Sequence, residues 1–243
     1  MEISKLVQII IFAIVNIAVF YFGGIKFYNI YKNVKLGKDQ EIEGESSKRL
    51  KNVILIALGQ KKMFKEIGPA FLHLAVYLAF LITQIELIEI FIDGFTGKHR
   101  VLYHLFEGSG FLTGIYVFVI NSIEVLSVLA LLATFVFLAR RNLLKVPRLV
   151  RSEMNGWPKL DANIILFVEI YLVTCIFMMN GGDQALNENS YPFVLSGALS
   201  GAIFSGLSEG ALHAIERIGW WGHILGVLGF IVYLPYSKHL HIL

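Results

Sequence analysis

The sequence predicts an all-α integral membrane bundle of five transmembrane helices. Of its 243 residues, 56% are hydrophobic and only 16% are charged, and the mean hydropathy is +0.67. A soluble protein of this size is more polar, whereas a multi-pass membrane protein has this composition. Five apolar segments are also long enough to cross a bilayer, which requires about 20 residues. We therefore expect one membrane domain over residues 1–243.

The residues at the ends of the predicted spans are consistent with transmembrane helices. The first lacks a basic leader and a small-residue cleavage site, so we interpret it as a span rather than a signal peptide. The second begins at Pro69, which is tolerated in a first helical turn, and the fifth contains Pro235 near its end. The predicted spans are 6–28, 69–92, 110–138, 162–179 and 212–236.

Two further segments are too short or too weakly apolar to span. Residues 46–64 predict a cytoplasmic interfacial helix, because an apolar core of about eight residues lies between lysines. This helix rests on anionic lipid or forms a docking surface for a cytoplasmic partner. Residues 191–210 are rich in Gly and Ser, and we expect an outer interfacial or re-entrant segment there.

Loop charges predict the orientation. Seventeen Lys and Arg residues lie in the first and third connections, at the C-terminus and, with Lys26, at the end of the first span, against four on the opposite side. Because basic loops stay in the cytoplasm, we expect the N-terminus outside and the C-terminus in the cytoplasm. No nucleic-acid partner is expected. The single cysteine, Cys175, excludes an iron–sulfur cluster held by this chain alone.

Histidines on the fifth span suggest a redox site. Four of the seven histidines follow residue 210, and His223 and His241 are eighteen residues apart, which is five helical turns. Both therefore lie on one helix face, about 27 Å apart along the axis. His73, near the cytoplasmic start of the second span, lies at the depth of His241 or His239. Two imidazoles on facing helices can ligate a b-type haem; the alternative is that His73 is a packed histidine.

The outer site has weaker candidates. A partner for His223 must come from the outer half of another helix, and Thr83 stands where the second span would offer one. His99 or His104, in the outer connection, is the available ligand, whereas His213 is offset on the helix and is expected at the surface. Cations suited to haem propionates, or to ordinary interfacial snorkelling, are Arg100, Arg217 and Lys238.

Carboxylates inside the spans form a second group of candidates. A charge near the bilayer centre costs about 3 kcal/mol on insertion scales, so such groups face the bundle interior, pair or are protonated. Glu86, Glu124 and Glu169 could serve a quinone site or a proton path. The alternative is that they are structural hydrogen-bond partners between helices.

Four stretches carry a resemblance that covers essentially the whole chain: GQKKMFKEIGPAFLHLAVYLAF, GKHR, RRN followed by GWPKLDANIILFVE, and WWGHILGVLGFIVYLPYSKHLHIL. They resemble the membrane domain of iron–sulfur oxidoreductases related to heterodisulfide reductase, which include electron-transfer-flavoprotein:menaquinone oxidoreductases. That domain is similar to the gamma subunit of respiratory nitrate reductase, a dihaem cytochrome b. In the family, the YLPYSKHLHIL end leads into a cytoplasmic domain with cluster motifs, which we expect as a separate subunit or a missing domain.

The resemblance implies haem ligation by His73, His223 and a histidine of the KHLH end, and Thr83 departs from the dihaem pattern. It implies a quinone-linked oxidoreductase of the bacterial inner membrane, whose electron-transfer component is not catalytic alone. Electrons would pass between cytoplasmic iron–sulfur clusters, one or two haems b and menaquinone, with electron-transfer flavoprotein as a candidate donor. The alternative is a non-redox transporter or scaffold whose intramembrane His and Glu bind protons or metal.

Overall fold

The computed structural model describes residues 2–38, 44–187 and 191–242, which are helical and contain no strand. Five helices in these ranges are long and apolar enough to cross a membrane, which confirms the predicted all-α five-span bundle. They contain between 25 and 33 residues and measure about 37–50 Å, more than the hydrocarbon thickness of about 30 Å. They are α1 (Glu2–Val34), α3 (Ile67–Thr96), α5 (Gly110–Leu138), α6 (Trp157–Leu186) and α8 (Glu209–Tyr233).

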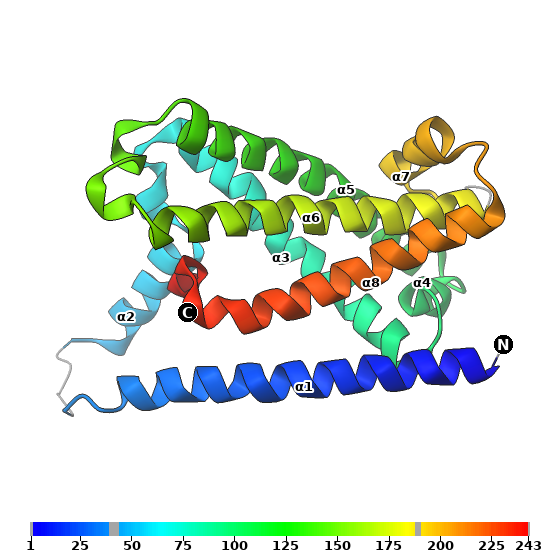
Figure 1. Cartoon of the computed structure of the whole chain (residues 1–243), viewed down its shortest axis with the longest axis horizontal. Coiled ribbons are helices and arrows are strands. Elements are labelled where there is room, and N and C mark those ends of the chain that lie inside the picture. The colour runs from blue at the N-terminus through cyan, green and yellow to red at the C-terminus, as the bar shows by residue number, and fades with distance from the viewer. Residues whose placement is uncertain (1, 39–43, 188–190, 243) are drawn as a thin grey trace.

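Short helical elements connect the spans. Those at the end of the bundle where α1 finishes are α2 (Ser46–Asn52), η1 (Val53–Leu58), η2 (Lys61–Lys65), η3 (Ala139–Leu143), η4 (Pro147–Leu149), η5 (Ser152–Met154), η7 (Leu234–Tyr236) and η8 (Lys238–Ile242). Those at the other end are α4 (Val101–Phe106), α7 (Val194–Leu199) and η6 (Ser200–Phe204). Figure 1 shows α4, α7 and the N-terminus at one end, and α2 and the C-terminus at the other. Which end faces the cytoplasm stays a prediction from the loop charges.

The segment predicted as one interfacial helix over 46–64 is divided. Helix α2 passes into the π-helical turn η1, and the chain then breaks at Gly59 and Gln60 before η2. A Cβ on Gly59 would lie 2.9 Å from the carbonyl oxygen of Leu55, and Gln60 has a left-handed φ of 51°. The helix ends at these two residues, because there is no room for a side chain at Gly59 and the φ of Gln60 is not helical.

Helices α6 and α8 pack most closely, and glycines make this packing feasible. A Cβ on Gly219 would lie 2.5 Å from the backbone nitrogen of Met179 and 2.7 Å from the carbonyl oxygen of Cys175. Gly222 and Gly226 face α6 in the same way. Small residues let membrane helices approach until backbone and side-chain atoms are in van der Waals contact, which drives association where the hydrophobic effect cannot.

Helix α1 lies along the edge of the bundle (Figure 1) and is anchored by Phe12. The Phe12 ring is 1% exposed and packs against Trp220 on α8 and Phe95 on α3, with ring centroids 5.6 and 4.9 Å apart. A Cβ on Gly94 would lie 2.5 Å from this ring, so the glycine makes room for it. The anchor fixes the N-terminal end of α1 beside the loop that follows α3.

The glycine packing gives a direct test. Gly219→Ala should lower the free energy of unfolding by about 1–3 kcal/mol, because the added methyl overpacks the α6 backbone. Gly229→Ala, on the same helix, has no atom within 4 Å of its added Cβ and should be neutral or stabilise by up to about 1 kcal/mol. Reversible unfolding in detergent measures both, and equal losses would contradict the close approach.

Candidate functional site

The candidate site is a buried polar network around Arg100, just after α3. The Arg100 side chain is only 5% exposed, and its Nε donates to Oδ2 of Asp183 at 2.5 Å. Its Nη2 donates to Oδ1 of Asn180 at 2.8 Å, and Nη1 reaches the Tyr116 hydroxyl at 3.4 Å. One guanidinium therefore joins the connection after α3 to both α5 and α6, with the fork geometry that suits arginine.

Aromatic rings and charge keep this guanidinium ionised. Burial alone lowers the pKa of Arg100, but the Asp183 carboxylate more than offsets it, so the pKa lies well above its usual value. The guanidinium lies 5.2 Å from the ring centroid of Tyr191 and 4.8 Å from that of Phe193. Burial also raises the pKa of Tyr191 to about 12, so this phenol is neutral where it contacts the cation.

Two acids of α3 hold the start of α4. The Asp93 carboxylate accepts from the backbone N–H groups of Arg100 and Val101, at 2.9 and 3.0 Å. The Glu89 carboxylate accepts from the N–H of Leu102 at 3.0 Å through its Oε1. These bonds satisfy the otherwise unpaired N–H groups of the first helical turn, which is why a left-handed Arg100 with φ 44° is held there.

Glu86 is the innermost acid of the network. It is 3% exposed, and its Oε1 accepts from the Nδ2 of Asn180 at 3.0 Å. Its Oε2 is buried and has no hydrogen-bond partner among the described residues. The sequence suggested Glu86, Glu124 and Glu169 as functional carboxylates. Of these three, Glu86 is the one that is hydrogen-bonded to the network around Arg100.

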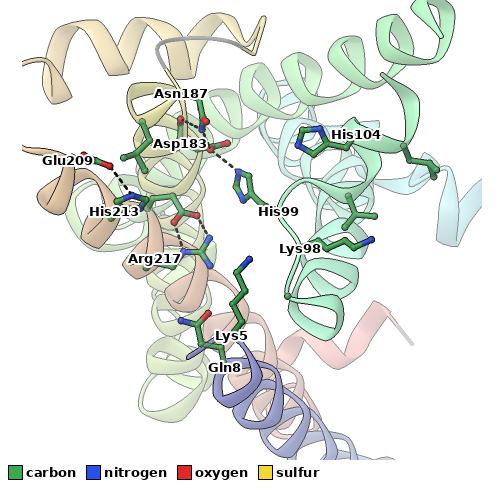
Figure 2. A pocket seen from close by; sticks show the side chains of 15 residues that line it. Lys5, Gln8, Lys98, His99, His104, Asp183, Asn187, Glu209, His213 and Arg217 are labelled. Atoms are coloured by element: carbon green, nitrogen blue, oxygen red, sulfur yellow. Dashed lines mark hydrogen bonds and ion pairs between the residues drawn. The ribbon is translucent and has the colours of Figure 1, made fainter. Parts of the chain in front are cut away.

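The network opens into a cleft of about 1030 Å³ at the α4 end of the bundle (Figure 2). His99 lines the cleft, and its Nε2 lies 2.8 Å from Oδ1 of Asp183. Across the cleft on α8, Arg217 pairs with Glu216, and His213 lies 3.8 Å from a carboxylate oxygen of Glu209. Lys5 and Lys98 also line it. A cleft of this volume can admit water and small polar ligands.

His223 lies inside the bundle, where the sequence predicted a haem ligand. It is 6% exposed, and its Nδ1 lies 3.2 Å from the carbonyl oxygen of Leu172 on α6. Because a carbonyl only accepts, Nδ1 carries the proton and Nε2 keeps its lone pair. Histidines that bind metals commonly have this arrangement, with the other ring nitrogen donating to a backbone carbonyl. The residue therefore fits a ligand role.

The structure does not bring the expected outer partners to His223. His99 bonds to Asp183 and His223 to Leu172, and these two α6 residues are eleven positions, or about 16 Å, apart. Two axial nitrogens of one iron are only about 4 Å apart, at roughly 2 Å per metal–nitrogen bond. His104 is 54% exposed and faces Glu107. A His223 pairing with His99 or His104 is thus not formed.

At the opposite end of the bundle the haem candidates are partly described. His73 is half-buried near the start of α3, and the His239 ring packs against Phe230 with centroids 5.3 Å apart. The side chain of His241 lies outside the described part. Asp161, 1% exposed, accepts from the Tyr233 hydroxyl at 2.5 Å and from the Lys238 N–H at 2.9 Å. Asp161 thereby fixes the start of η8, which carries both C-terminal histidines.

The predicted propionate partners differ in what they do. Arg100 is buried in its own ion pair, and Arg217 is paired with Glu216 and lies 5.4 Å from the Trp220 ring. Each of the two guanidinium groups is held by a neighbouring carboxylate. Lys238 is exposed beyond the end of α8.

The other two nominated carboxylates have distinct surroundings. Glu124 is 0% exposed and accepts from the N–H groups of Leu195 and Ser196 and from the Ser196 hydroxyl. These bonds anchor α7 to α5, as a structural hydrogen-bond partner would. Glu169 is half-buried on α6 and has no hydrogen bond or ion pair within the described residues.

Sequence reasoning missed most of the network, although a signal was present. Glu86, Glu89 and Asp93 recur at intervals of three and four on α3, and Asn180 and Asp183 repeat the interval of three on α6. Polar residues at that spacing share one helix face. A polar stripe at the end of each of two spans predicts that the stripes meet, and the structure brings them together.

Comparison with known proteins gives one informative relative. The chain is 26% identical over 213 residues to the probable iron–sulfur-binding oxidoreductase FadF of Bacillus subtilis (strain 168). The match covers 86% of this chain but only 28% of FadF, so the chain spans less than a third of that relative. No family model matches the chain. No solved structure matches it either.

The network makes a testable prediction for stability. Arg100→Gln should lower the free energy of unfolding by about 3–5 kcal/mol, because it leaves Asp183 buried without its cation. Arg148→Gln is the matched control, since its pair with Glu66 is more than half exposed and should contribute no more than about 1 kcal/mol. Chemical unfolding of both variants measures the difference, and similar losses would contradict a central role for Arg100.

Proposed function

We propose that the chain is the membrane electron-transfer part of an iron–sulfur oxidoreductase. The observation that carries this proposal is the similarity to FadF, which runs through most of the chain. A cluster is usually held by four cysteine thiolates, and this chain has only Cys175. The clusters therefore belong to a partner protein or another domain, and this chain supplies the passage into the membrane.

The electron carrier within the bundle is proposed to be one haem b at the α2 end, held by His73 and His241. Both residues belong to segments at that end of the bundle, and Asp161 fixes the turn that bears the second one. When bound, a bis-histidine haem supplies one-electron transfer. The basic loops at the same end would face the cytoplasm and a cytoplasmic donor, such as an iron–sulfur protein or an electron-transfer flavoprotein.

His223 is given no haem in this proposal. Its Nδ1 bond to Leu172 orients the ring, and this also ties α8 to α6. A second haem at His223 would require a ligand other than His99 or His104, whose side chains lie elsewhere. We therefore propose a single haem, with a membrane quinone, of the menaquinone type by resemblance, as the lipid-soluble redox partner. The whole assembly is a quinone-linked oxidoreductase of the bacterial cytoplasmic membrane.

The proposal predicts a b-type reduced-minus-oxidised spectrum for the purified full-length chain, with one haem per chain. His73→Ala and His241→Ala should each abolish that spectrum, whereas His239→Ala should keep it, because its ring packs on Phe230. His213→Ala, at a 61% exposed position, is the matched surface control and should retain full haem content. Pyridine haemochrome quantification gives the count.

Two results would contradict the proposal. A purified chain without a b-type band would favour the alternative, a membrane transporter or scaffold that uses its buried His and Glu for protons or a metal ion. Two haems per chain, with one lost in His223→Ala, would contradict the single-haem assignment and return His223 to the ligand set.

A further inference from the structure

Glu86 differs from every other buried acid that surrounds the network. Both oxygens of Asp93 accept backbone N–H groups, and Glu89 accepts two N–H groups and the Tyr116 hydroxyl. Asp183 accepts from Arg100 and Asn187 and contacts His99. Such bonds stabilise ionised carboxylates. Glu86 has one amide donor, from Asn180, and an unpartnered buried Oε2.

The burial of Glu86 does not favour a carboxylate there. Its charged neighbours are Arg100, Glu89 and Glu124. Arg100 is already paired with Asp183, and reaches Glu86 only through the Asn180 amide. An ionised Glu86 would be attracted by Arg100 and repelled by Glu89 and Glu124, and it would have almost no exposed surface through which water could solvate it. Burying such a charge is far more costly than burying the neutral acid.

The hydrogen-bonded series that begins at Glu86 runs in one direction, towards the cleft. Towards the cleft, the bonded series runs from Asn180 to Arg100, Asp183 and His99, and His99 lines the cleft (Figure 2). Towards the opposite end, the α6 positions one and two turns before Asn180 are Ile176 and Val173, both at most 5% exposed. Four and seven residues before Glu86 on α3 stand Ile82 and Ala79. The bonded polar groups that start at Glu86 therefore end at the cleft, whereas these positions of α3 and α6 towards the opposite end are apolar.

We propose that Glu86 is a proton-binding site in the bundle interior, a neutral carboxylic acid at pH 7 that exchanges its proton with the aqueous phase on the cleft side. Asn180 holds the acid, and Arg100 with Asp183 holds Asn180. The site stands on the geometry of the bundle and does not require haem. Its use in supplying or accepting the protons of a quinone, by contrast, rests on the proposed function.

The first test is infrared spectroscopy of the full-length chain in phosphatidylcholine vesicles at pH 7. The carbonyl stretch of a protonated carboxylic acid should be present in the wild type and lost in Glu86→Gln. Glu107→Gln, an exposed control at 63% exposure, should keep the band. Asn180→Leu should retain the band but move it to higher frequency, because the hydrogen bond to Oε1 is lost. A wild-type band that Glu86→Gln leaves unchanged would overturn the proposal.

The side of exchange is tested on vesicles in which the chain is inserted in one direction. A pH step on the side that the N-terminus faces should change the Glu86 band, because Lys5 and Gln8 of α1 line the cleft there. A response only to the opposite side would overturn the route. Neither measurement needs haem, so a chain without a b-type spectrum could still pass both, and the two proposals fail separately.

Stability gives an independent readout if an infrared band is weak. Glutamine matches the neutral acid in shape and charge, so Glu86→Gln should leave the melting temperature nearly unchanged. Asp183→Asn removes the charge that pairs with Arg100 and should lower it clearly. A loss in Glu86→Gln as large as that in Asp183→Asn would mean that Glu86 is ionised and paired, and would contradict the proposal.

Discussion

The ion pair between Arg100 and Asp183 is the interaction on which the cleft end of the bundle depends. The side chain of Arg100 points into the bundle, because the backbone N–H of Arg100 donates to the carboxylate of Asp93 in the last turn of α3. The guanidinium then meets Asp183 and Asn180 on α6. Arg100 thus holds α5 and α6 to the end of α3, and the acids Asp93 and Glu89 of α3 cap the start of α4. Without the cation, several carboxylates would face one another in a place with little water.

This arrangement explains why the ends of the spans were underestimated from the sequence. The second and fourth spans were expected to stop at about residues 92 and 179, just before Asp93 and Asn180. Helices α3 and α6 instead continue to Thr96 and Leu186. Polar residues lower the mean hydropathy and so mark the end of a predicted span. They do not end the helix when their side chains have hydrogen-bond partners inside the protein. Hydropathy therefore located the five spans, and only the tertiary pairing fixed their ends.

The sequence indicated which residues belong to the candidate site, but it predicted less well what each side chain contacts. Intramembrane Glu86 and His223 were rightly singled out as residues that need a partner, since both are buried. Arg100 was expected to be a candidate partner for haem propionates on the outer side, and its side chain lies in the core, because its left-handed backbone depends on contacts distant in sequence. Glu124 was expected either in a quinone or proton path or as a structural partner between helices, and its carboxylate accepts N–H groups at the start of α7. No local pattern encodes which acid will be given backbone donors and which will not.

The two ends of the bundle can accordingly take different tasks. The α2 end has the basic loops, His73 and the turn that Asp161 holds, and it is the end for which electron exchange is proposed. The α4 end has the cleft and the acid Glu86, which suits proton exchange with water. Electrons can cross apolar protein between carriers, whereas protons need polar groups or water. A continuous polar path through the bundle would let protons leak, and the apolar residues Ile176 and Val173 beneath Asn180 separate the two tasks.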